Sequence, residues 1–143
     1  MTDYELMGAA LAEAEQAAAL GEVPVGAVIA KDGEIIASAH NTRETEKNAL
    51  HHAELLAIDA ACKKLGGWRL WECELFVTLE PCPMCAGAIL NSRIRRVVYG
   101  AADAKAGCCG FGIGGSLVSK KMIQSGNYEA LTQTAKDILA ALQ

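Results

Sequence analysis

The sequence predicts an α/β protein in which helices cover both faces of a mixed sheet, a three-layer α/β/α sandwich. The first indication is an alternation of short runs rich in β-forming residues with longer runs that have helical periodicity. The second is size, because 143 residues of which 52% are hydrophobic suit one domain with a substantial core. The sequence contains no internal repeat or linker-like stretch. We therefore expect residues 1–143 to form a single domain.

The first element is expected to be a helix that begins after Thr2 and ends at Gly21. Thr2 and Glu5 have the spacing of a capping box, in which each side chain binds the other residue's backbone N–H. Glycine is common where helices end. Apolar residues at helical spacing should face the sheet, and they are Leu6, Ala10, Leu11, Ala14, Ala18 and Leu20.

A hairpin and a second helix should follow. Residues 25–30 and 34–39 are strand-like, and Lys31-Asp32-Gly33 between them suits a tight turn. After a polar loop at 40–44, a helix is expected over 49–65, stopped by Gly66-Gly67. Asp59 and Lys63 have the spacing of an ion pair on its outer face. Its expected buried residues are Leu55, Ile58, Cys62 and Leu65.

The rest of the chain should add two strands and further helices. Residues 74–79 have the apolar character of a buried strand, and residues 96–101 are also strand-like. Pro83 suits the first turn of a helix between them, where its missing N–H costs nothing. Residues 102–115 form a glycine-rich loop, and the chain from Leu117 onward is expected to be mostly helical, ending in the segment 134–142.

Composition narrows the class of protein. The sequence has no run of about 18 apolar residues, and its start is acidic, so we expect neither a membrane span nor a signal peptide. Six cysteines, two of them in a setting typical of metal ligands, indicate a reducing cytoplasm rather than a disulfide scaffold.

The motif that indicates chemistry is Pro81-Cys82-Pro83-Met84-Cys85, which opens an apolar helix. A helix N-terminus favours thiolate over thiol, so both sulfurs are suited to bind a metal. A further ligand is available thirty positions upstream (82 − 52), in His51-His52-Ala53-Glu54. Catalytic zinc takes three protein ligands and leaves the fourth position for water. His52, Cys82 and Cys85 supply that number, and we expect one Zn²⁺ per chain.

Glu54 lies two residues beyond His52 and is placed to act as a general base rather than as a ligand. The combination of H-x-E with P-C-x-x-C is the signature of the zinc deaminases that act on nucleobases. The alternative is a structural zinc site with Cys108 or Cys109 as fourth ligand and a merely solvated Glu54.

The remaining histidines and cysteines have simpler interpretations. His51 should face elsewhere on the helix than His52, and His40 is interpreted as a residue at a strand end. Cys62 and Cys73 are expected to pack in the core rather than bind metal.

Basic residues are concentrated after the second zinc helix. The net charge is −4, yet residues 93–121 carry a single acidic residue, Asp103, against six basic ones: Arg93, Arg95, Arg96, Lys105, Lys120 and Lys121. This asymmetry is typical of a site for a polyanion, and the alternative is a solvated basic face. Because the run directly follows the helix that carries Cys85, we expect it to flank the mouth of the active site.

The chain resembles the bacterial tRNA-specific adenosine deaminases of the cytidine deaminase superfamily. The resemblance covers about residues 4 to 110 and includes EVPVGAVIAKDG, HNTRET, HHAELLAI and the long run WRLWECELFVTLEPCPMCAGAILNSRIRRVVYGAADAKAG. The stretch TLEPCPMCAGAI with SRI and VVYGA-D-K-G after it is far more specific than the metal motif alone. The resemblance implies a cytidine deaminase-like fold.

The resemblance also implies a reaction and a partner. The reaction would convert adenosine to inosine at the wobble position, A34, in the anticodon loop of tRNA, by a cytoplasmic homodimer with one zinc per subunit. His52, Cys82 and Cys85 would hold the metal, and Glu54 would shuttle protons. The residues that match substrate-binding positions are Asn41, Ala53, Asp103 and Lys105.

The chain departs from the family pattern from about residue 108. It reads GCCGFGIGGSLVSKK, has Asn127-Tyr128 where the family has Asn-His, and ends in DILAALQ without a basic, aromatic helix. Two alternative functions therefore stay open. One is a zinc deaminase of a free nucleobase, nucleoside or other small amine, of the guanine or cytosine type. The other is a non-catalytic binding module stabilised by zinc.

Overall fold

The computed structural model describes residues 1–102 and residue 133. Within that part of the chain, four strands form one sheet in the order β2-β1-β3-β4. Strand β1 (Gly26–Lys31) runs antiparallel to both β2 (Glu34–His40) and β3 (Cys73–Leu79), while β3 is parallel to β4 (Arg96–Ala101). The mixed sheet expected from the sequence is therefore confirmed, with strand ends within two residues of the expected ones.

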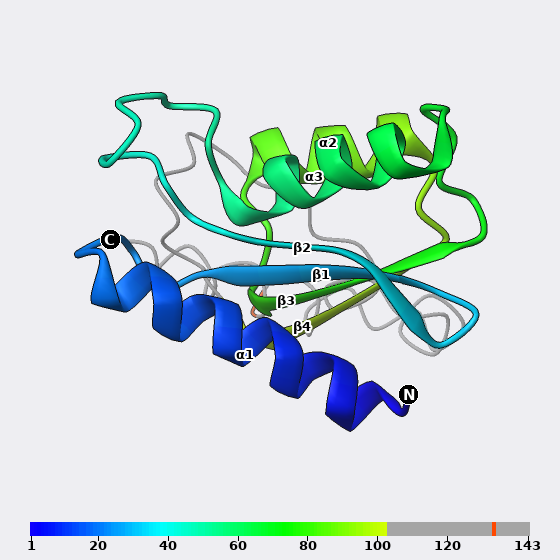
Figure 1. Cartoon of the computed structure of the whole chain (residues 1–143), viewed down its shortest axis with the longest axis horizontal. Helices are drawn as coiled ribbons and strands as arrows, with labels where there is room; N and C mark the ends of the chain where they lie inside the picture. The colour runs from blue at the N-terminus through cyan, green and yellow to red at the C-terminus, as the bar shows by residue number, and fades with distance from the viewer. Residues whose placement is uncertain (103–132, 134–143) are drawn as a thin grey trace. The chain divides into compact units, whose positions relative to one another are not determined.

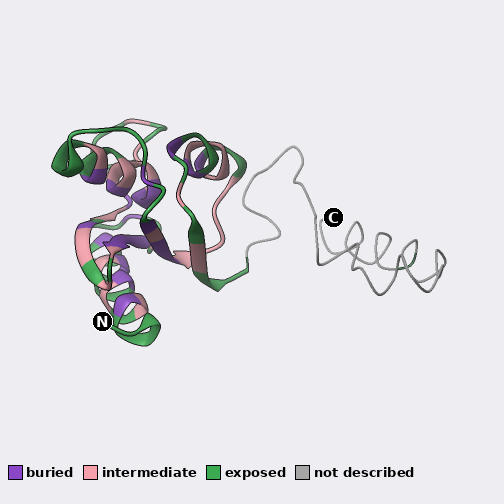
Figure 2. Ribbon diagram, turned by 90° about the vertical axis from the view of Figure 1, so that its right-hand side faces the viewer, coloured by how far each residue is buried: buried purple, intermediate pink, exposed green. Residues whose placement is uncertain are grey.

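Helices cover both faces of this sheet (Figure 1). Helix α1 (Asp3–Ala19) lies on one face, and α2 (Ala53–Leu65) and α3 (Pro83–Ser92) lie on the other. Two separate clusters of buried residues result, because successive side chains of a strand point to opposite faces. Val28 and Phe76 pack toward α1, whereas Ile29 and Leu75 pack toward α2. Buried residues are concentrated where the helices face the strands (Figure 2). The sheet and the helices on its two faces are therefore the three layers of an α/β/α sandwich.

Helix α1 packs unusually closely against the start of β1. A Cβ atom at Gly26 would lie 2.1 Å from the carbonyl oxygen of Ala10 and 2.4 Å from the backbone nitrogen of Ala14. Only glycine fits at this position of β1, and the helix residues nearest to it, Ala10 and Ala14, are also small. The buried stripe of α1 is completed by Leu6 and Ala17. The expected stripe was wrong in part, because Leu11, Ala18 and Leu20 are exposed.

Helix α2 begins at Ala53, four residues later than expected. The preceding residues form turns instead, since the side chain of Asn48 accepts a hydrogen bond from the N–H of Leu50 and the N–H of His51 donates to the carbonyl of Asn48. Gly66, in the left-handed region at φ 69°, ends the helix as expected. The expected ion pair between Asp59 and Lys63 is present at 2.6 Å.

The buried face of α2 also differs from the expected one. It consists of Ala53, Glu54, Ala57 and Ala61, while Ile58 and Cys62 pack at its margin and Leu65 is exposed. Small residues again occupy the contact with the sheet, which displaces the larger apolar side chains to the edges.

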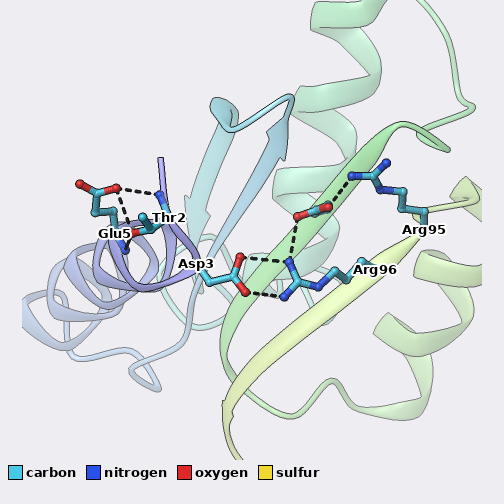
Figure 3. A network of polar contacts seen from close by, with 6 residues as sticks. Thr2, Asp3, Glu5, Arg95 and Arg96 are labelled. Carbon is cyan, nitrogen blue, oxygen red and sulfur yellow. Dashed lines mark hydrogen bonds and ion pairs between the residues drawn. The ribbon is translucent and has the colours of Figure 1, made fainter.

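A polar network joins the start of α1 to the sheet (Figure 3). The capping box of Thr2 and Glu5 is present. One residue on, Asp3 pairs with Arg96, whose guanidinium also donates to Glu74 at 3.1 Å. Arg95 pairs with the other oxygen of Glu74 at 2.5 Å. These contacts fasten the first turn of α1 to the starts of β3 and β4.

Several expectations fall outside the described residues. They are the glycine-rich loop at 102–115 beyond Ala102, the helical region from Leu117 onward, and the segment 134–142. No helix in residues 1–102 is long and apolar enough to cross a membrane.

Candidate metal centre

Four strand ends meet at one edge of the sheet. His40 at the end of β2 pairs with Gly26 at the start of β1, whose N–H donates to the Thr78 hydroxyl near the end of β3 at 3.1 Å. Leu79 of β3 pairs in turn with Ala101, the last residue of β4. The segments that leave this edge carry most of the residues that the sequence singles out, because Asn41 follows β2, Cys82 follows β3, and the chain after β4 continues toward Asp103.

The three expected ligands come together beside this edge. His52 is the N-cap of α2, Cys82 is the N-cap of α3, and Cys85 lies in the first turn of α3. The Nδ1 atom of His52 lies 3.7 Å from the Sγ atom of Cys82 and 3.5 Å from that of Cys85. All three donor atoms lie within 4.8 Å of one another. Both helix N-termini therefore direct the positive ends of their dipoles at one cluster, which favours thiolates.

The spacing of these atoms fits zinc. Tetrahedral zinc with Zn–S bonds of about 2.3 Å and Zn–N bonds of about 2.1 Å places a sulfur about 3.6 Å from a nitrogen. The two measured nitrogen–sulfur distances lie on either side of that value. Burial, with Glu54 and Cys82 adding to it, raises the pKa of the Cys85 thiol, so an ionised sulfur at this fully buried position requires a cation beside it.

Glu54 lies beside the cluster without being part of it. It is the second residue of α2, its side chain is only 4% exposed, and it interacts with Cys85. Burial raises the pKa of its carboxyl group, with the nearby His52 acting in the opposite direction. A buried carboxyl group whose protonated form is favoured in this way can accept a proton and hold it for transfer.

The other histidines and cysteines of the described chain lie apart from the cluster, as the sequence suggested. His51 is held by Asn48, whose Nδ2 atom is 3.0 Å from its Nε2 atom, and by Glu46. His40 pairs with Glu13 at 2.7 Å. Cys62 packs against the core and Cys73 is buried in it. Cys108 and Cys109 lie outside the described residues, so the structure leaves a fourth cysteine ligand untested.

The expected substrate-binding residues divide into two groups. Asn41 is 6% exposed. The N–H of the next residue, Thr42, donates to the carbonyl of His51 at 3.1 Å, so Asn41 adjoins the segment that carries His52. Ala53 is fully buried as the first residue of α2. Asp103 and Lys105 lie outside the described residues.

Glu22 is a feature of the site that the sequence did not reveal. Its carboxylate is 5% exposed and accepts hydrogen bonds from Asn41, Glu44 and Thr45. The sequence offers only a weak signal for it, an acidic residue directly after the helix-ending Gly21. Nothing in the spacing of the chain links residue 22 to residues 41–45, because the contact depends on how the hairpin and α1 pack together.

The position expected for part of the basic run was wrong. Arg96 pairs with Glu74 at the start of β3, at the opposite end of the two parallel strands from Leu79 and Ala101. Five residues of strand (79 − 74) separate these ends by about 16 Å. Arg95 and Arg96 therefore lie away from the metal centre, where acidic residues already pair with them.

Comparison with known proteins agrees with this geometry. The family model of the MafB19-like deaminases matches residues 1–143. The tRNA-specific adenosine deaminase of Bacillus subtilis (strain 168) is 60% identical over 111 residues, which cover 77% of this chain and 69% of that protein. The corresponding protein of Aquifex aeolicus (strain VF5) is 54% identical over 98 residues, 68% of this chain and 65% of that protein.

Solved structures give the same fold. One from studies of A-to-I editing by tRNA:A34 deaminases is 47% identical, with a TM-score of 0.70, and the match covers 71% of this chain and 74% of that one. The guanine deaminase of Bacillus subtilis is 29% identical, with a TM-score of 0.71 over 90% of this chain and 94% of that one. The chain spans about two thirds of the length of the curated relatives described above. It belongs to the MafB19-like deaminase family and is a relative, by sequence, of the bacterial tRNA-specific adenosine deaminases.

Proposed function

We propose that this chain is a zinc-dependent hydrolytic deaminase that converts adenosine to inosine at the wobble position, A34, of tRNA. The observation that carries the proposal is the convergence of His52, Cys82 and Cys85 within 4.8 Å, with the buried Glu54 beside them. The match of the family model to residues 1–143 supports treating the whole chain as one deaminase domain. We further propose that it acts in the cytoplasm as a homodimer with one Zn²⁺ per subunit.

The reaction replaces the 6-amino group of adenosine with oxygen from water and releases ammonia. When bound by His52, Cys82 and Cys85, zinc supplies Lewis acidity that lowers the pKa of water toward about 7. Glu54 accepts one of the two protons of the attacking water and passes it to the purine ring, then accepts the second and passes it to the departing amine, so inosine keeps the first proton and ammonia carries away the second. Its burial supports this role, because a raised pKa allows the carboxyl group to hold the proton between the two transfers.

Substrate recognition is assigned to the segments that leave the same sheet edge. Asn41 would contact the nucleoside, Ala53 would line its pocket, and Asp103 and Lys105 would contact the neighbouring nucleotides. A duplex hides the reactive carbon, so the substrate nucleotide must be unstacked from a loop. An anticodon loop presents such a nucleotide.

A guanine deaminase is the second candidate. One observation favours it: the Bacillus subtilis guanine deaminase matches 90% of this chain, more than the 71% matched by the tRNA:A34 deaminase. The sequence identities point the other way, at 29% against 47%. The departure from the adenosine deaminase pattern after residue 108 gives the second candidate its remaining support.

One assay separates the candidates. The purified zinc-loaded protein is incubated with an anticodon stem-loop that contains A34, with a matched stem-loop that carries G34, and with free adenosine, guanine and cytidine. We expect inosine and one equivalent of ammonia from the A34 stem-loop alone. Deamination of guanine with no reaction at A34 would establish the second candidate instead. Zinc binding without release of ammonia from any substrate would indicate a binding module.

A further inference from the structure

A buried carboxylate holds the loop that follows β2. The side chain of Glu22 accepts hydrogen bonds from four groups of residues 41–45. Its Oε1 atom accepts from the N–H of Thr45 at 2.5 Å and from the Thr45 hydroxyl at 2.6 Å. Its Oε2 atom accepts from the N–H of Glu44 and from the Nδ2 atom of Asn41, both at 3.2 Å.

We propose that Glu22 is a positioning residue that fixes the orientation of the Asn41 side-chain amide toward the substrate nucleoside. This inference rests on the proposed function, in which Asn41 contacts that nucleoside. A carboxylate only accepts hydrogen bonds, so the end of the Asn41 amide that faces Glu22 has to be the Nδ2 end. A flipped amide would place its oxygen against a carboxylate oxygen. Glu22 therefore keeps the Oδ1 atom of Asn41 on the side away from itself.

The charge of Glu22 makes this orientation firm. Hydrogen bonds from Thr45 lower the pKa of the Glu22 carboxyl group below its ordinary value, so the group is ionised at neutral pH. Hydrogen bonds to an ionised acceptor are stronger than those between neutral groups. With Glu22 and Asn41 both buried, water competes little for their contact.

The loop is also tied to the metal centre. The backbone N–H of Asn41 donates to the carbonyl of Val25 at 3.1 Å, which extends the pairing of β2 with β1 by one residue. The N–H of Thr42 donates to the carbonyl of His51 at 3.1 Å, directly before the ligand His52. Asn41 thus has a fixed backbone at the edge of the metal centre, and Glu22 fixes the remaining freedom of its side chain.

Substitution of Glu22 by Gln tests the proposal, because Gln keeps the size of the side chain and makes one of its two ends a donor. Either end can then face Asn41, and the amide of Asn41 is free to flip. We expect KM for the A34 stem-loop to rise about tenfold while kcat changes by less than about threefold. Zinc content should be unchanged.

Two comparisons distinguish positioning from general support of the loop. Glu74→Gln is the matched control, since Glu74 also binds several donors but lies at the far end of β3; it should lower stability and leave KM unchanged. In a double-mutant cycle, Glu22→Gln should add little to the KM defect of Asn41→Ala, because both changes act through the same amide.

Each outcome has one meaning. Wild-type activity on the stem-loop is measured first. If the wild-type protein does not deaminate the stem-loop, the proposed function fails independently of the variants. If the wild type is active but Glu22→Gln leaves KM unchanged, or if its effect adds fully to that of Asn41→Ala, the positioning role is overturned. Should Glu22→Gln not fold, Glu22→Asp shortens the reach of the carboxylate toward Asn41 and is read in the same way: a raised KM supports the proposal, and an unchanged KM with a lower melting temperature contradicts it.

Discussion

Glu54 illustrates how one buried residue can be assigned a role by its surroundings. It lies against the ligand cluster, yet it is not one of the three groups whose donor atoms converge. We predict that Glu54→Gln lowers kcat on the A34 stem-loop by a factor of about 10² to 10⁴, because Gln keeps the shape but cannot accept a proton. The measurement is inosine formation at saturating stem-loop, with zinc quantified in the same sample. A near-normal rate would place the base elsewhere, and a loss of zinc would make Glu54 a ligand.

Single substitutions of the cysteines test whether the cluster binds zinc. We predict that wild-type protein contains about one zinc per chain and that Cys82→Ser and Cys85→Ser each lose it and unfold at lower temperature, because the energy of metal binding is partly folding energy. Cys73→Ser is the matched control for Cys85→Ser, since Cys73 is as buried as Cys85 but lies apart from the cluster. It should lower the melting temperature and retain zinc. Folded, active protein without metal would contradict the prediction.

At the scale of elements, the first turn of α1 is held to the sheet by charge. Hydrogen bonds from Arg96 lower the pKa of Asp3, and those from Arg95 and then Arg96 lower the pKa of Glu74. A carboxyl group with a lowered pKa in the folded state stabilises the protein above its unfolded pKa, which is about 4. That stabilisation is lost as the pH falls through the folded-state pKa.

We therefore predict that Arg96→Gln lowers the melting temperature at pH 7 by a few degrees at most, and that the difference from wild type shrinks below about pH 4. Thermal unfolding followed by circular dichroism between pH 7 and pH 3 measures it. Lys63→Gln is the control, because its partner Asp59 lies in the same helix and no second element is released. A difference that stays constant across this pH range would show that Arg96 acts through packing instead.

At the scale of the whole molecule, the cluster of candidate metal ligands could be predicted from the sequence, and the contacts that surround it could not. Zinc chemistry restricts ligand types and places two of them on one helical turn, so His52, Cys82 and Cys85 are visible in the sequence. The alanine face of α1 was not visible, because it depends on the close approach of that helix to Gly26. The contact of Glu22 with Asn41 was hidden for the same reason, as it forms only when α1 and the hairpin have packed.

The distribution of charge over the molecule gives the last prediction, which concerns binding of the tRNA stem-loop. From sequence alone, Arg95 and Lys105 belong to one basic run, and the structure describes the surroundings of Arg95. Arg95 lies directly before β4 and pairs with Glu74, at the end of β3 and β4 opposite Leu79 and Ala101, whereas Lys105 lies outside the described residues.

We therefore expect Lys105→Ala to weaken binding of the A34 stem-loop and to reduce the slope of log Kd against log salt concentration by about one, the effect of losing one phosphate contact. Arg95→Ala should change neither quantity, because its guanidinium is already paired with a carboxylate about 16 Å of strand away from the site. Fluorescence anisotropy across a salt series measures both variants, with zinc content as the check on folding. Equal losses of stem-loop affinity in the two variants would show that Arg95 also belongs to the RNA interface. Binding that ignores salt altogether, in the wild type as well, would instead favour a small neutral substrate.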